Sequence, residues 1–267
     1  MRAPLLLSLG VAVGFAGLAS AQTEFPFFDD FESGEVAPNW EQDSTNNPSW
    51  DEAGEWTAVQ EDLDWRGEMV EPPPGGGEWF GRLANAPASA ITARRLVGTN
   101  DAVDYTISTD MYVQNVSADE PPDNFFYQMI IFGAQDGLDY CRFHFHHNED
   151  EGTLPDGPRI RIQTRYASFD TILDEPTADL IGDDAEGWYN VRIDVNNSDM
   201  TINVTVNGVG LNDGDPITVN QAPFANGGKA GIGTYINGDT GGLFRSIYYD
   251  NFFAGEFTDV GDWAVYE

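Results

Sequence analysis

The feature that most constrains the fold is the regular alternation of short apolar runs and turn residues from Asp104 onward. Runs rich in Val, Ile, Thr, Tyr and Phe are separated by clusters of Gly, Pro, Asn and Asp, which is the pattern of antiparallel strands joined by turns. Segments with helical periodicity are nearly absent. The sequence therefore predicts an all-β sandwich or jelly roll and not a parallel α/β sheet. The expected strands are 105–113, 125–132, 140–146, 159–166, 189–195, 201–206, 230–235 and 246–253.

Residues 1–21 have the features of a secretory signal peptide. Arg2 precedes a short apolar stretch, and Ala19-Ser20-Ala21 is a small-x-small cleavage signature. No later stretch approaches about 18 continuous apolar residues, so we expect no membrane insertion. The sequence predicts a secreted protein, extracellular or at the cell surface, in which residues 22–267 form a single domain.

The charge of the chain limits its partners. It has 45 acidic and 12 basic residues, a formal net charge of −33, and Lys229 as its only lysine. Such a field repels nucleic acid and anionic membranes, so we expect neither as a partner. A hydrophobic content of 41% argues against a disordered acidic tail. The single cysteine, Cys141, excludes an intramolecular disulfide, and we expect it to be a buried thiol on a strand.

Residues 35–79 differ from the rest of the chain because they combine many acidic residues with five tryptophans and the run Pro72-Pro73-Pro74-Gly75-Gly76-Gly77. The Pro/Gly run is compatible with a linker between domains. We expect instead one long Trp-rich loop region inside a single domain.

Five stretches, taken in order, resemble those of a known superfamily. They are an opening strand at 27–34, strands at 187–195 and 200–208, a Gly-rich strand at 228–233 and a closing strand at 239–253. Together they resemble the concanavalin A-like lectin/glucanase superfamily, including its laminin-G-like and secreted bacterial members. The resemblance implies a two-sheet antiparallel jelly-roll sandwich in which the opening strand pairs beside the closing strand.

The resemblance also implies a structural calcium ion near the chain ends. Members of the superfamily hold it with an acidic residue of the opening segment, a backbone carbonyl and an aspartate of the closing strand. The matching residues here are Asp30, Glu32, Gly34 and Asp250. Oxygen ligands of this kind suit Ca²⁺. Alternatively, Asp30 and Asp250 are strand-edge acids that discourage edge pairing.

Two neighbouring strands present a polar face. In 140–146 and in 159–166, polar and apolar residues alternate, so each strand has one polar face and one core face. A hairpin would place the two polar faces side by side and concentrate scarce positive charge there. Arginine forks bind carboxylates in a bidentate manner, so the strip suits a uronic-acid glycan; alternatively it is a solvated outer sheet neutralised by Asp and Glu. The candidate ligand-binding residues are Arg142, His144, His146, Arg161 and Arg165, with Trp79 as an aromatic platform for sugar.

Catalytic signatures are weaker than the binding pattern. The Glu-x-Asp-x-x-Glu motif, by which laminarinase-type hydrolases place two carboxylates on one strand, is absent from the sequence. Arg, His, Gln and Tyr residues resemble those of alginate-lyase-like jelly rolls in type, but not in their local motifs. The sequence favours a non-catalytic, lectin-like protein that binds carbohydrate, with acidic polysaccharide as the expected ligand. The alternatives are a polysaccharide lyase or glycoside hydrolase, and a matrix or surface-layer protein that self-assembles through calcium.

Overall fold

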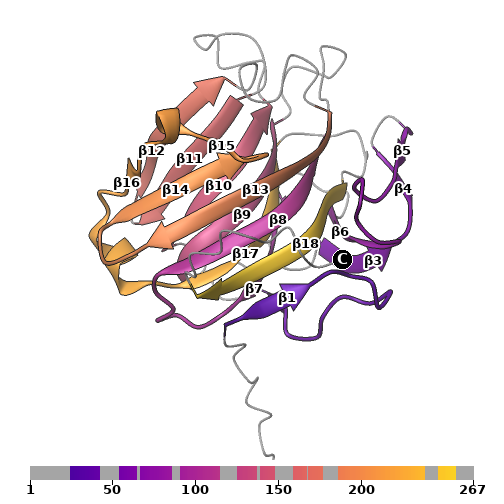
Figure 1. Cartoon of the computed structure of the whole chain (residues 1–267), viewed down its shortest axis with the longest axis horizontal. Coiled ribbons are helices and arrows are strands. Elements are labelled where there is room, and N and C mark those ends of the chain that lie inside the picture. Colours follow the sequence, from indigo (N-terminus) through magenta and orange to yellow (C-terminus); the bar gives the residue numbers. More distant parts are fainter. Residues whose placement is uncertain are drawn as a thin grey trace, which may run out of the picture.

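The computed structural model describes residues 25–42, 54–64, 67–85, 91–114, 125–136, 139–147, 159–166, 168–176, 186–237 and 246–256. Over these ranges the chain forms two large antiparallel sheets that lie face to face (Figure 1). The predicted all-β, two-sheet antiparallel sandwich is therefore confirmed. In the part of the chain that the structure describes, no helix is long and apolar enough to cross a membrane.

Sheet A has nine strands in the order β15-β14-β13-β8-β18-β6-β3, with β1 beside β18 and β16 beside β14. Its strands are β1 (Phe27–Asp29), β3 (Gly54–Val59), β6 (Phe80–Asn85), β8 (Tyr105–Val113), β13 (Gly187–Asn196), β14 (Thr201–Val206), β15 (Val209–Gly210), β16 (Ile217–Thr218) and β18 (Ser246–Glu256). The opening strand pairs with the closing strand, since Phe27 lies opposite Ala254 and Asp29 opposite Phe252.

Sheet B has seven strands in the order β12-β11-β10-β9-β17-β7-β2. They are β2 (Glu41–Gln42), β7 (Ile91–Val97), β9 (Phe125–Asp136), β10 (Asp139–His147), β11 (Arg159–Tyr166), β12 (Ser168–Pro176) and β17 (Lys229–Asn237). A separate hairpin joins β4 (Asp62–Leu63) to β5 (Met69–Val70), and two short 3₁₀ helices are η1 (Asn212–Gly214) and η2 (Ala222–Asn226).

The prediction of a long loop over 35–79 is wrong in part, because β2, β3, β4 and β5 all lie in that range. β3 forms an edge of sheet A by pairing with β6. Its Trp56 packs at the border of the core, edge to face with Phe31 and Trp40 at ring-centroid distances of 5.3 and 5.7 Å. The tryptophans thus supply packing surface that anchors a strand.

The core lies between the sheets and follows from the alternation of side chains. On β10, Cys141, Phe143 and Phe145 are fully buried in it, so Arg142 and His144 lie on the opposite, outer face of sheet B. The predicted burial of Cys141 is confirmed.

Tyrosine hydroxyls of sheet A tie the two sheets together by hydrogen bonds to backbone groups of β9. The Tyr249 hydroxyl donates to the Met129 carbonyl at 2.8 Å, and the Tyr105 hydroxyl accepts the Gly133 N–H at 2.8 Å. Gly133 has a φ of 60°, and an added Cβ would lie 2.7 Å from the Tyr166 hydroxyl. A side chain at this position would therefore be both strained and crowded.

Candidate functional site

The predicted polar strip is brought together by the register of β10 and β11. Arg142 lies opposite Gln163, His144 opposite Arg161 and Tyr140 opposite Arg165. We call the outer surface of sheet B around Arg142, His144, Arg159, Arg161 and Arg165 the arginine face. His146 lies opposite Arg159 in the backbone register, but its side chain lies outside the described residues.

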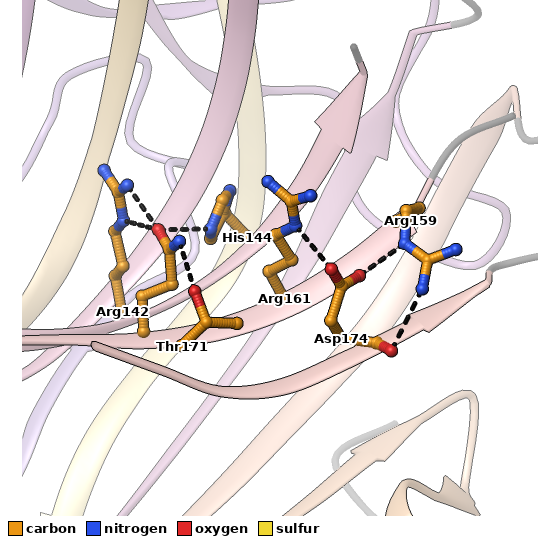
Figure 2. Close-up of polar contacts among 7 residues, drawn as sticks. Arg142, His144, Arg159, Arg161, Thr171 and Asp174 are labelled. Atoms are coloured by element: carbon orange, nitrogen blue, oxygen red, sulfur yellow. Dashed lines mark hydrogen bonds and ion pairs between the residues drawn. The ribbon is translucent and has the colours of Figure 1, made fainter. Parts of the chain in front are cut away.

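Gln163 is the centre of one half of the arginine face (Figure 2). Its Oε1 accepts the Arg142 Nε–H at 3.0 Å and a second hydrogen bond from Arg142 Nη2, and lies 3.1 Å from His144 Nε2. Its Nε2 donates to the Thr171 hydroxyl at 2.9 Å. The amide thereby fixes a guanidinium group and an imidazole side by side, and ties β10 to β12 across β11.

Asp174 organises the other half of the face. Its Oδ2 accepts the Arg161 Nε–H at 3.0 Å, while its Oδ1 accepts the Arg159 Nε–H and its backbone carbonyl accepts Arg159 Nη2 at 3.1 Å (Figure 2). One carboxylate therefore neutralises two arginines. This matches the alternative prediction of neutralised charge, but not that of a solvated sheet, since Arg142, His144 and Arg161 are 8%, 0% and 7% exposed.

Asp174 reaches this position because β12 contains a bulge. Gln163 lies opposite Thr171, but the next residue, Ile162, lies opposite Leu173. The extra residue, Ile172, packs against the core together with Leu173. A bulge shifts the alternation by one residue, so Phe169 and Thr171 before it and Asp174 after it all point to the outer face.

Aromatic and apolar side chains lie beside the arginines. Arg142 Nη1 lies 3.5 Å from the Met129 sulfur, and the Arg94 guanidinium lies 5.0 Å from the centre of the Tyr140 ring. Phe169 lies 4.7 Å from the Arg165 guanidinium and 5.3 Å from that of Arg142. Arg94, Asp174 and Phe169 were not predicted from the sequence, because the adjacent pairs Arg94-Arg95 and Ile172-Leu173 interrupt the alternation of β7 and β12.

Trp79, the predicted stacking platform, lies elsewhere. It directly precedes β6 of sheet A, its N–H donates to Glu32 Oε1 at 3.0 Å, and an added Cβ on Gly34 would lie 3.3 Å from its ring. The structure therefore places Trp79 against the predicted calcium residues and does not bring it to the arginine face. The physical reason is that Glu32 anchors this loop to the sheet A side of the sandwich.

The predicted calcium residues gather where β1 lies beside β18. Asp250 is 1% exposed; its Oδ1 accepts the Asn251 N–H at 2.8 Å, and its Oδ2 has no hydrogen-bond partner. An added Cβ at Gly76 would lie 3.0 Å from this Oδ2, so the turn around Gly76 closes over it. Asp110 lies directly opposite on β8.

Burial raises the pKa of Asp250 to about 8; the Asn251 N–H lowers this pKa, and the nearby charges of Asp110, Glu32 and Asp30 raise it further. Glu32 accepts two backbone N–H groups, from Glu78 and Trp79, and Asp30 accepts the N–H of Glu32 at 3.2 Å. A buried oxygen without a hydrogen-bond partner, close to other carboxylates, is an environment that a hard divalent cation would stabilise.

A second acidic group was not anticipated from the sequence. Among the residues that the structure describes, the acidic side chains with oxygens all within 4.8 Å of one another are Asp64, Glu68 and Glu186, and not the predicted set. Asp64 is already engaged, since its Oδ1 accepts the Glu68 N–H at 2.8 Å. The group lies where the β4–β5 hairpin approaches β13.

Comparison with known proteins supports the fold and leaves the function open. No family model matches the chain, and no curated protein matches it. One similar structure, described as "Prominent members of the human gut microbiota express endo-acting O-glycanases to initiate mucin breakdown", has a TM-score of 0.52 and 12% identity over 87% of this chain and 99% of that one. The fold is thus the predicted concanavalin A-like jelly-roll sandwich, whereas the laminin-G-like subtype stays a prediction.

Two further similar structures have lower TM-scores. An endo-beta-1,4-glucuronan lyase from the fungus Trichoderma reesei has a TM-score of 0.44 and 11% identity over 86% of this chain and 95% of that one. A sialidase has a TM-score of 0.46 and 17% identity over 89% of this chain. The chain spans 19% of the length of that sialidase.

Proposed function

We propose that the protein is a secreted, non-catalytic carbohydrate-binding protein that takes acidic polysaccharide on its arginine face. The observation that carries the proposal is the gathering of five arginines from β7, β10 and β11 on one face of a chain with a net charge of −33. These are Arg94, Arg142, Arg159, Arg161 and Arg165. Guanidinium groups recognise carboxylates by paired hydrogen bonds, and the shared fold with the O-glycanase structure supports a glycan as the ligand class.

A lyase is the second candidate, because Arg142, His144 and Gln163 are residues of the types that such enzymes use to neutralise a uronate and move its proton. The burial of His144 argues for binding instead. Its side chain is completely buried and its Nε2 lies against Gln163, whereas a general base must reach the proton that it removes.

A column of immobilised polyuronate tests the proposal. Wild-type protein should be retained at low salt and released as ionic strength rises, because salt screens the attraction. Arg165→Gln should weaken retention, while Arg192→Gln, on β13 of sheet A, should leave it unchanged. Equal loss in both variants would contradict a site on the arginine face, and rising ultraviolet absorbance from new unsaturated chain ends would identify a lyase.

We also propose that Asp250 and its acidic neighbours Asp30 and Glu32, with the Gly34 carbonyl, bind a structural Ca²⁺. The buried and unpartnered Oδ2 of Asp250 supports this proposal. Bound calcium would neutralise the cluster and hold the loop around Gly76 against β18. Assembly of the protein into larger particles on adding calcium would favour the matrix or surface-layer alternative over a monomeric lectin.

A further inference from the structure

The arginine face is not uniformly accessible. Arg142, His144 and Arg161 are all less than a tenth exposed, so a ligand can touch only their outermost atoms. Phe169, by contrast, is 55% exposed, and its neighbour Thr171 on the same side of β12 is also exposed. A glycan therefore first meets the protein at the β11–β12 side of the face, where β12 forms the edge of sheet B.

Phe169 is an exposed phenyl ring that stands beside two positive charges. It lies directly opposite Arg165 in the register of β11 and β12, with guanidinium distances to its ring centre of 4.7 Å for Arg165 and 5.3 Å for Arg142. Cation–π attraction holds these groups together at an exposed site. The ring is thus held at the β12 edge of the arginine face, and more than half of its surface is exposed.

The chemistry of a uronic-acid residue matches this arrangement. The C–H face of a pyranose is apolar and stacks on aromatic rings, and its carboxylate seeks a guanidinium group. Phe169 supplies the first contact and Arg165 the second, on adjacent strands. Neither neutral sugars nor small anions would use both groups.

We propose that Phe169 and Arg165 form a subsite for one hexuronic-acid residue, which stacks on the phenyl ring while its carboxylate binds the guanidinium group. This inference rests on the proposed function, because it names the part of the arginine face that receives the glycan. Phe169 is the aromatic platform in place of Trp79, which lies on the other side of the sandwich.

Calorimetric titration with a linear hexuronic-acid tetrasaccharide, and with the same tetrasaccharide after reduction of its carboxyl groups, separates the two contacts. Phe169→Ala should raise the Kd for both sugars about tenfold, the change that a stacking contact of about 1.4 kcal/mol produces. Arg165→Gln should raise the Kd for the charged sugar alone. Phe169→Trp keeps an aromatic ring at this position and should bind both sugars like the wild type.

The matched control is Phe28→Ala, because Phe28 on β1 of sheet A is 56% exposed and so equally accessible. It should bind like the wild type. The thermal unfolding midpoint of Phe169→Ala should match that of the wild type, which would show that the variant is folded. If Arg165→Gln weakens binding but Phe169→Ala does not, the subsite is wrong while the proposed function stands; if the wild type binds neither tetrasaccharide, both fail.

Discussion

Replacing Asp174 by Asn should destabilise the fold and strengthen glycan binding at the same time. Asp174 makes ion pairs with Arg159 and Arg161 while its side chain is 24% exposed and theirs are 12% and 9% exposed. Exposed pairs contribute about 0–1 kcal/mol, and breaking a buried pair costs about 3–5 kcal/mol. The Asp174 ion pairs are partly buried and so lie between these two cases. We therefore expect Asp174→Asn to lower the free energy of unfolding by about 2 kcal/mol.

For a domain of this size, each kcal/mol lowers the unfolding midpoint by about 2–4 °C, so Asp174→Asn should unfold roughly 4–8 °C lower. Circular dichroism melts and urea titrations measure both quantities. The same change removes one negative charge from the arginine face and releases two guanidinium groups, so the Kd for a polyuronate at low salt should fall about threefold or more.

Asp170→Asn is the matched control, because Asp170 is an exposed aspartate on the same strand. Its side chain accepts one long hydrogen bond, from Gln221 Nε2 at 3.4 Å. Its melting midpoint should stay within about 1–2 °C of the wild type. An Asp174→Asn protein that melts like the wild type, or binds the polyuronate more weakly, would refute the account of Asp174 as the neutralising carboxylate of the face.

The remaining predictions concern buried titratable groups. Because the folded state holds the Asp250 proton more tightly than the unfolded chain, this group stabilises the fold most below about pH 4 and progressively less as the pH rises towards its folded pKa of about 8. Calcium needs the ionised carboxylate, so calcium at about 100 times its Kd should raise the midpoint by roughly 5–10 °C at pH 8 and by less at pH 5. Asp250→Asn should abolish the calcium effect and melt higher than the metal-free wild type at pH 8; a full calcium effect in this variant would place the ion elsewhere. Burial raises the pKa of Cys141 to about 12, so iodoacetamide at pH 8 should label it only in urea, and labelling of the native protein, seen by intact mass, would contradict the packing of β10.

The central strands were predictable because their burial is one-sided. On β8, β11 and β14 every second residue enters the core, and such a period of two is visible in the sequence alone. The same alternation on β10 and β11 was enough to predict that Arg142, His144 and Arg161 share a face.

What the sequence could not predict depends on breaks in that period. β12 was missed because Ile172 and Leu173 both turn inward at the bulge, so no regular alternation marks Phe169 and Asp174 as outward-facing. β7 was missed because Arg94 and Arg95 are adjacent and obscure its alternation. Trp79 was misplaced because its position depends on a hydrogen bond from its N–H to Glu32, 47 residues away, and no local pattern reports such a contact.

The most direct test is to map where an acidic glycan touches the folded protein, by hydrogen–deuterium exchange of backbone amides with and without a saturating hexuronic-acid oligosaccharide. A ligand on the arginine face slows exchange in β10, β11 and β12, while β13 and β14 of sheet A exchange as before. Protection confined to sheet A or to the loop around Gly76, with sheet B unchanged, would contradict the account.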